Sequence, residues 1–335
     1  MRILGEPSHM GRIFAIISSV LGSIIGAGFS TGQEIFYFFS QFKETSIFYI
    51  SLSSILILLI LLYLMDIKIK SRVILKIFRA YILLFSIITL IVMFSAFGQL
   101  GEEFLGVSRY IFTLLCFILS IAIFKHGLLA VVNINKVVVS ILIITVSFIF
   151  LRSVRKNEII FQFESLKYAL PKNFFQHLTF PLLYSAYNSL LAFPVVNGLK
   201  ERFHKEEIKL SIVISSILIF LLLNIINTIL LSKSSIQNSQ MPLLKAEKSV
   251  FFQFILVASA FLEILTTVLA NYMGLCYSIK NSKVEFFVII ISLLLGFNQF
   301  QVLLRKLYSL MGYIGLGIIV MLSLSTLLSK DRMLK

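Results

Sequence analysis

The residues best suited to chemistry lie in the segment GSIIGAGFSTGQE, residues 22–34, where an apolar stretch carries four glycines, several hydroxyls and one carboxyl group. Glycine in a helix interior costs about 1 kcal/mol relative to alanine, so this spacing predicts a break in a helix. A half-helix that begins near Ser30 would point free N–H groups into the gap, which suits a carboxylate. The preceding half-helix would end in free carbonyl groups, which suit a cation or an ammonium group.

The same glycines also allow a simpler interpretation. Gly22 with Gly26, and Gly28 with Gly32, form pairs of small residues spaced four apart, a pattern typical of close helix packing in membranes. Packing, however, does not require a carboxyl group. An ionisable side chain within a membrane span is costly and usually faces a cavity or a partner, so we expect Glu34 to take part in ion binding or coupling.

A second polar cluster lies in FPLLYSAYNSLLAFP, residues 180–194, which places Tyr184, Asn188 and Ser189 between two prolines. The prolines alone could be ordinary kinks. The cluster also stands where an inverted repeat would place the partner of residues 22–34. Two interrupted helices at matched positions predict a binding site between them.

A third cluster lies in FLEILTTVLANYMG, residues 261–274. Glu263, Thr266 and Thr267 share roughly one helix face, because residues three and four apart are neighbours. Threonine hydroxyls often bond back to their own helix, which is one interpretation. The other is that Thr266 and Thr267 ligate a sodium ion together with carbonyl groups near Ser23.

Lys136 is the one amine that does not obviously belong to a loop. Its stem is long enough to reach the membrane surface by snorkelling. Alternatively, it pairs with a carboxylate or replaces a coupling cation, which would make transport ion-independent or proton-linked.

The elements that must position these residues are membrane helices. Of the 335 residues, 59% are hydrophobic and 13% charged, and the mean hydropathy is +0.99, which excludes a soluble domain of this size. In such a chain a net charge of +15 reflects basic cytoplasmic loops, so nucleic acid is not an expected partner. The partners we expect are the lipid bilayer and a small-molecule substrate, with no resident cofactor.

About ten segments are long and apolar enough to be spans. The predicted fold is therefore an all-α integral membrane protein, one transmembrane domain over residues 1–335. Five spans in each half would make the second half insert upside down, as in inverted repeats covering approximately 11–151 and 173–328. The predicted spans are 11–40, 46–65, 78–99, 110–124, 128–151, 173–199, 210–231, 250–279, 284–298 and 307–328.

Orientation follows from Lys and Arg, which concentrate in alternate connections such as 68–79 and 200–209. We expect a multi-pass protein of the bacterial inner membrane with both termini in the cytoplasm. The connections 152–172 and 232–249 are then outer loops, whose short amphipathic helices could act as gates. Glu102 and Glu103 are expected to be solvated in an outer loop on the same side.

The motif GSIIGAGFSTGQEIFYFF resembles the first-helix signature of the YkvI-type family of uncharacterised bacterial membrane proteins, a family of amino-acid permease candidates in the amino acid-polyamine-organocation superfamily. The segments LLYSAYNSLLAFPVV and EILTTVLANYMGL look like the sixth and eighth helices of that family. The resemblance implies the leucine-transporter (LeuT) fold, which has two inverted five-helix repeats. In that fold helices 1 and 6 are broken at mid-membrane and the substrate binds between them.

The resemblance also implies roles for individual residues. The backbone of Gly26, Ala27, Gly28, Phe29 and Ser30 would cradle the two charged ends of the substrate. Side chains facing that substrate would come from the sixth helix, namely Tyr184, Asn188 and Ser189. The hydroxyl pair of the eighth helix, Thr266 and Thr267, would complete a sodium site. Lys136 departs from the family pattern and leaves the coupling ion open.

The sequence thus predicts a secondary active transporter of a small zwitterionic solute, an amino acid by class, that works by alternating access with sodium or proton coupling. The alternative from another class is a transporter-like receptor subunit, similar to germinant sensors, that binds an amino acid without moving it. An enzyme is not expected, because the sequence contains no HExxH, GxSxG or phosphate-loop motif.

Overall fold

The computed structural model describes residues 9–67, 71–124, 128–155, 177–232, 239–279 and 282–331, and within these ranges the regular structure is entirely helical. Apolar segments of this length can satisfy their backbone hydrogen bonds inside a membrane only as helices or closed barrels. The elements are α1 (His9–Ile24), α2 (Ala27–Ser30), α3 (Gln33–Phe38), η1 (Ser40–Thr45), α4 (Ser46–Asp66), α5 (Arg72–Leu105), α6 (Arg109–Phe124), α7 (Leu128–Arg155), α9 (Thr179–Leu199), α10 (Lys205–Leu231), α11 (Pro242–Ala246), α12 (Val250–Ser278), α13 (Ser282–Gly296) and α14 (Phe300–Asp331).

The chain is an all-α membrane protein. Among the described residues, five helical stretches are long and apolar enough to cross a bilayer: Ser40–Asp66, Arg72–Leu105, Lys205–Leu231, Val250–Tyr272 and Phe300–Ser325. Large apolar side chains such as Leu59, Ile118, Ile144 and Val320 are more than half exposed. Outward-facing apolar residues on long helices are typical of a surface that contacts lipid.

The predicted break in the first segment is confirmed, and the chain is interrupted there twice. After α1 ends at Ile24, Gly26 is extended, with φ −127° and ψ −175°. The single turn α2 follows, and Gly32 then takes the left-handed conformation, with φ +76°, before α3 begins. Glycine adopts that conformation without the steric cost that a Cβ atom would add.

The predicted break in the sixth segment is wrong for the residues that the structure describes. Helix α9 is continuous from Thr179 to Leu199 and passes through Pro194. Pro181 stands in the first turn, where a backbone N–H would have no partner within the helix, so it does not interrupt α9. The Asn188 side chain donates to the Tyr184 carbonyl oxygen (3.0 Å) and thus bonds to its own helix.

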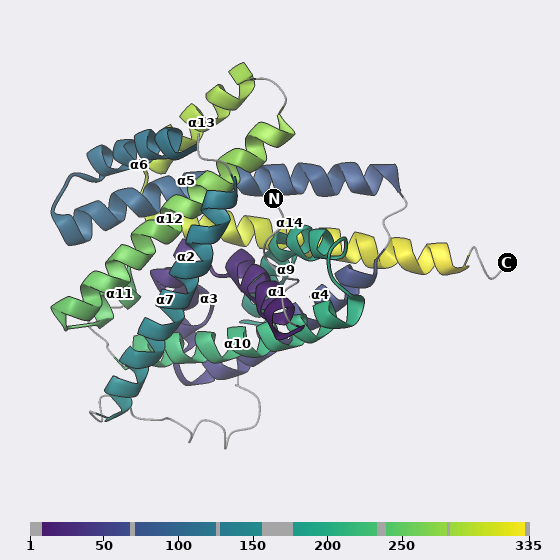
Figure 1. Cartoon of the computed structure of the whole chain (residues 1–335), viewed down its shortest axis with the longest axis horizontal. Coiled ribbons are helices and arrows are strands. Elements are labelled where there is room, and N and C mark those ends of the chain that lie inside the picture. Colours follow the sequence, from purple (N-terminus) through teal and green to yellow (C-terminus); the bar gives the residue numbers. More distant parts are fainter. Residues whose placement is uncertain are drawn as a thin grey trace.

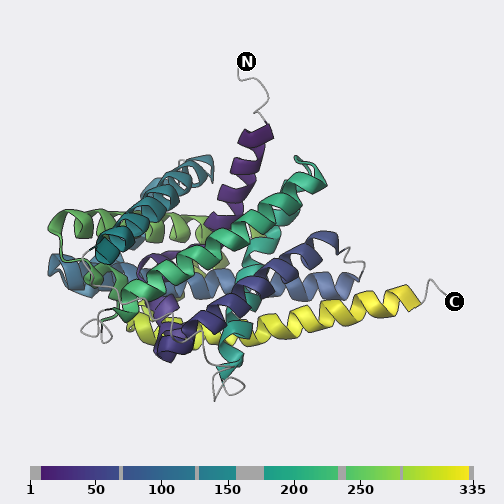
Figure 2. The ribbon, with the colours of Figure 1, turned by 90° about the horizontal axis from the view of Figure 1, so that it is seen from below.

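The helices pack in two groups (Figure 1). In the first group α4 packs on α9 and α10, and α1 packs on the same two helices. In the second group α12 packs on α5, α6 and α7, and α13 packs on α5. Helix α14 contacts both α9 and α5, and Figure 2 shows it running alongside α5 toward the C-terminus. The first segment lies between these groups, since α1 contacts α9 and α2 contacts α12.

The connection between α10 and α12 folds back into the bundle as α11. Met241, Leu243 and Leu244 are fully buried, and the Leu243 N–H donates to the Thr31 carbonyl oxygen (3.0 Å). A short helix in this connection is as predicted. Of the other connection, residues 156–172 lie outside the described residues.

Candidate functional site

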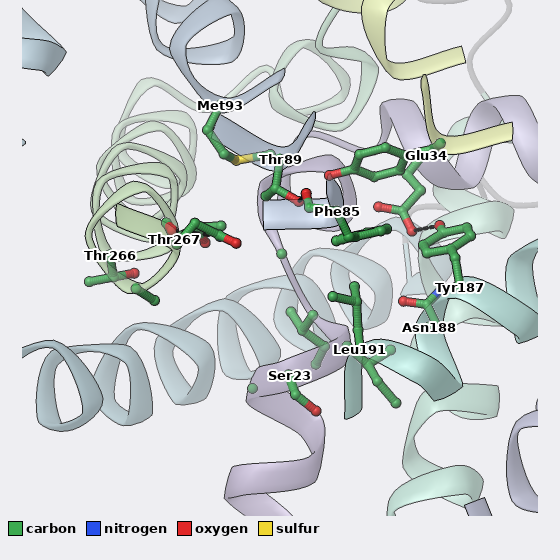
Figure 3. Close-up of a pocket in the computed structure, with 17 residues that line it drawn as sticks. Ser23, Glu34, Phe85, Thr89, Met93, Tyr187, Asn188, Leu191, Thr266 and Thr267 are labelled. Atoms are coloured by element: carbon green, nitrogen blue, oxygen red, sulfur yellow. Dashed lines mark hydrogen bonds between the residues drawn. The ribbon is translucent and has the colours of Figure 1, made fainter. Parts of the chain in front are cut away.

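A cavity of about 250 Å³ opens where the first segment is broken (Figure 3). Ligand pockets for drug-sized molecules have volumes of about 300–1,000 Å³, so this one suits a small solute. It is bounded by the end of α1, by α3 and by side chains of α5, α9, α12 and α14. The lining residues are Gly22, Ser23, Ile24, Ile25, Gly26, Glu34, Phe85, Thr89, Met93, Tyr187, Asn188, Leu191, Thr266, Thr267, Ala270, Asn271 and Tyr308.

The end of α1 presents its backbone to the cavity. The Ile25 N–H still donates to the Leu21 carbonyl oxygen (2.7 Å), and the chain then leaves the helix. The last carbonyl groups of a helix have no following N–H within that helix to accept. The carbonyl groups of Gly22, Ser23 and Ile24 therefore form the negative end of a helix dipole at the cavity wall.

Of the predicted cradle, only Gly26 lines the cavity. Ala27, Gly28, Phe29 and Ser30 are buried, because the turn α2 packs against α12. The Ser30 hydroxyl donates to the Ala27 carbonyl oxygen (3.2 Å). The predicted role of these four residues in substrate binding stays a prediction, and their backbone lies behind the cavity wall.

Among the described residues that line the cavity, Glu34 alone carries a carboxyl side chain, and it is 3% exposed. It is positioned by α3 and accepts a hydrogen bond from the Tyr187 hydroxyl group. Gly28 makes room for it, since a Cβ atom at residue 28 would lie 2.5 Å from Glu34 Oε2. A larger residue at position 28 would therefore displace the carboxyl group.

Three aromatic rings from three helices meet beside Glu34. The ring of Tyr187 lies 6.2 Å from that of Phe85 and 5.4 Å from that of Tyr308, measured between centroids. The rings of Phe85 and Tyr308 are 6.1 Å apart. All three residues line the cavity, and Figure 3 shows Phe85, Glu34 and Tyr187 on one side of it. We call Phe85, Tyr187 and Tyr308 the ring cluster.

The predicted site residues of the sixth segment separate into two sets. Asn188 lines the cavity next to Glu34. Tyr184 and Ser189 are fully buried outside the lining, and their hydroxyl oxygens have no hydrogen-bond partner. The Tyr184 ring packs instead against Phe39, with centroids 4.8 Å apart.

Helix α12 brings Thr266 and Thr267 to the cavity, across from Glu34 (Figure 3). The Thr266 hydroxyl donates to the Glu263 carbonyl oxygen (3.1 Å), so the bond back to its own helix is present. The hydroxyl oxygen keeps lone pairs for a cation. A sodium ion at this pair stays a prediction.

Glu263 lies on the same helix but behind the cavity wall. Its side chain is fully buried and neither carboxyl oxygen has a hydrogen-bond partner. Ser30 and Glu34 are its nearest polar neighbours, and the Ser30 proton is already given to the Ala27 carbonyl oxygen. The turn α2 thus has Glu34 of α3 on its cavity side and Glu263 of α12 on its other side.

Two further predicted residues can be placed in part. Ser23 lines the cavity, and its hydroxyl donates to the Val20 carbonyl oxygen (2.7 Å). Lys136 belongs to α7, but its side chain lies outside the described residues.

Sequence reasoning missed the contribution of α5 and α14, which supply Phe85, Thr89, Met93 and Tyr308. These side chains stand in ordinary apolar segments, where nothing local distinguishes them from lipid-facing residues. Tyr308 carried a weak signal, as a hydroxyl group inside a span. No Lys, Arg or His side chain is among the residues that line the cavity in the described part of the chain.

A network of polar side chains holds α11 in place. Lys245 Nζ lies 3.0 Å from Glu103 Oε2, and the Ser239 hydroxyl donates to the same oxygen (3.1 Å). Arg152 Nη1 lies 3.5 Å from Glu247 Oε1. The expectation that Glu103 is solvated is therefore wrong: its side chain is 11% exposed, because α11 folds over it.

Comparison with known proteins adds no relative to this picture: neither a protein-family model nor a curated protein matches the chain.

Proposed function

We propose that this chain is a secondary active transporter that moves a small amine-bearing solute across the membrane by alternating access. An amino acid is the class that the resemblance to the YkvI-type family implies. The observation that carries the proposal is the cavity at the break in the first segment. Helix ends and a buried carboxyl group at membrane depth are tolerated only where they serve a cavity or a partner.

Helix packing supports an inverted repeat of five and five spans. An offset of five spans makes α1 the counterpart of α9, α4 of α10, α5 of α12, α6 of α13 and α7 of α14. Under this exchange helix contacts match in pairs: α4 with α9 matches α10 with α1, α5 with α14 matches α12 with α7, and α5 with α13 matches α12 with α6. A LeuT-like arrangement of two repeats would produce this reciprocity.

The two ends of the bundle differ in a way that alternating access requires. At the α11 end, α11 packs on α10 of the first group and on α12 of the second, so it bridges the two groups. Ion pairs hold α11 to α5 and Glu247 to α7. At the other end, Arg12 pairs with Glu207 (2.9 Å) and Lys205 with Asp66 (2.7 Å), and both pairs stay within the group of α1, α4 and α10. This asymmetry supports a state that is closed at the α11 end. Because basic residues concentrate at the opposite end, we propose that the α11 end faces the outside of a bacterial inner membrane.

Glu34 and Glu263 are the groups best placed to couple transport to protons. A carboxylate buried without a partner is costly, so each carboxyl group holds a proton or faces a cation. If the cationic solute replaces the proton on Glu34, solute movement is linked to proton movement. Sodium at Thr266 and Thr267 is the alternative coupling ion.

The proposal is tested by uptake of labelled amines and amino acids into proteoliposomes, with sodium and pH gradients imposed separately. We expect concentrative uptake that a proton gradient drives and that sodium replacement leaves unchanged. Folded protein that supports no uptake and no counterflow of any of these solutes would contradict transport. Binding without flux would favour the receptor alternative.

A further inference from the structure

From the walls of the cavity we infer that its ligand is recognised by an ammonium group and needs no carboxylate: the substrate class is a small organic amine, held by Glu34 and the ring cluster. The inference rests on the proposed function only for the movement of that amine. The binding site itself can be tested on protein that is not transporting.

The ring cluster provides the first argument. A cation within about 6 Å of an aromatic ring centroid is attracted by the ring, most strongly where water is excluded. The centroids of Phe85, Tyr187 and Tyr308 lie 5.4–6.2 Å apart, which is the spacing of rings in direct contact, so a small cation would bind against the side of the ring cluster that lines the cavity. Aromatic walls of this kind are a known solution for binding organic ammonium ions.

Charge provides the second argument. Glu34 reaches the cavity beside the ring cluster, and the Tyr187 hydroxyl that donates to it fixes the position of one carboxyl oxygen. The carbonyl groups that end α1 add partial negative charge from the opposite wall. Both features favour a positive ligand group.

The same walls disfavour a carboxylate. Among the described residues no lining side chain carries a positive charge, so a ligand carboxylate would lose its hydration and gain only neutral hydroxyl and amide donors in return. The turn α2, which would have to supply N–H groups, is four residues long, and Ala27 and Gly28 lie outside the lining.

The remaining surface fixes the rest of the ligand. Met93, Leu191 and Ala270 give the cavity an apolar part that suits a short hydrocarbon chain, and Thr89 and Asn271 add neutral polar groups beside it. In about 250 Å³ there is room for an amine with a few carbon atoms. The inferred ligand is therefore an ammonium group on a short apolar chain.

Three probes of the same shape separate these contributions: isoamylamine, leucine and 4-methylpentanoate carry respectively the amine alone, both charges, and the carboxylate alone. Tetramethylammonium serves as a fourth probe that cannot lose its charge. Binding to the purified full chain in detergent is measured by calorimetry. We expect isoamylamine and tetramethylammonium to bind, leucine to bind at least about tenfold more weakly than isoamylamine, and 4-methylpentanoate not to bind.

Two substitutions locate the site. Glu34→Gln, which keeps the shape of the side chain, should weaken isoamylamine binding by at least about tenfold, and the exposed Glu201→Gln should leave it unchanged. Phe85→Leu should weaken tetramethylammonium binding by about 2- to 30-fold, the range expected for the loss of one cation–π contact. Phe94→Leu, a buried substitution on the same helix but outside the lining, is its matched control.

The inference fails if leucine or 4-methylpentanoate binds as well as the amine, if neither amine probe binds, or if Glu34→Gln and Glu201→Gln bind isoamylamine equally. If one of these results is found together with uptake of zwitterions, the inferred substrate class is wrong but the proposed transport stands. If amines bind but are not moved, the inferred ligand stands and the proposed transport is wrong. The unfolding midpoint of every variant is measured alongside, so that loss of folding is recognised.

Discussion

The close approach of α11 to the second interruption makes Gly32 a position where one added methyl group should be costly. A Cβ atom at residue 32 would lie 2.7 Å from Leu243 Cβ and 3.0 Å from the Leu243 backbone nitrogen. The φ angle of Gly32, +76°, is also in the left-handed region. Gly32→Ala is therefore expected to strain the backbone and push α11 away from the break.

The size of the effect follows from its parts. A non-glycine residue in the left-handed region costs about 1–2 kcal/mol. Moving Leu243 loses its hydrogen bond to the Thr31 carbonyl oxygen, a net contribution of about 0.5–1.5 kcal/mol. Together they predict a loss of about 1.5–3.5 kcal/mol in the free energy of unfolding, measured by chemical denaturation in detergent.

Two other glycines separate these contributions. Gly106 has φ +64° but nothing within 4 Å of an added Cβ atom, so Gly106→Ala should lose only the backbone part, about 1–2 kcal/mol. Gly26 has an ordinary φ and open space, so Gly26→Ala should change stability by no more than about 1 kcal/mol and can raise it. If Gly32→Ala costs no more than Gly106→Ala, α11 does not pack against the break as described.

Three further predictions concern coupling and closure. Replacing Thr266 and Thr267 by Val should abolish any sodium stimulation of uptake, and unchanged stimulation would remove the pair from an ion site. Lys245→Ala should cost no more than about 1 kcal/mol of stability, because the lysine is 43% exposed. It should nevertheless raise the labelling, from the α11 end, of a cysteine introduced into the cavity wall. Exchanging Lys245 and Glu103 should restore the original labelling, and no restoration would argue against this ion pair as the closure. Glu263→Gln should leave the protein at least as stable as the wild type, since a buried amide carries no charge, while reducing proton-driven uptake about tenfold or more; full proton-driven uptake would exclude Glu263 from coupling.

Local pattern predicted the all-helical membrane architecture, because length and apolarity are properties of the segment itself. Of the ten predicted spans, five are long and apolar enough to cross a bilayer among the described residues. The break in the first segment was predictable for the same reason, since the glycines lie within it. The second interruption at Gly32 depends on where Leu243 packs, more than two hundred residues away in the chain. The sequence pattern contains no record of that contact.

The errors had the opposite origin, since each was a local inference that distant packing overrides. The prolines of the sixth segment suggested a break, but Pro181 falls in the first turn of α9 and Pro194 is accommodated within it. Glu103 was predicted to be solvated, but α11 covers it. The ring cluster draws on α5, α9 and α14, and no short motif could announce a site assembled from three helices.

The central claim is that the cavity beside Glu34 is the transport site, and counterflow tests it most directly. Proteoliposomes are loaded with unlabelled tetramethylammonium, which does not cross lipid unaided, and entry of labelled tetramethylammonium is followed for the wild type, Glu34→Gln and Glu201→Gln. We predict transient accumulation for the wild type and Glu201→Gln and at least a tenfold lower rate for Glu34→Gln. Equal accumulation by all three proteins would contradict the claim.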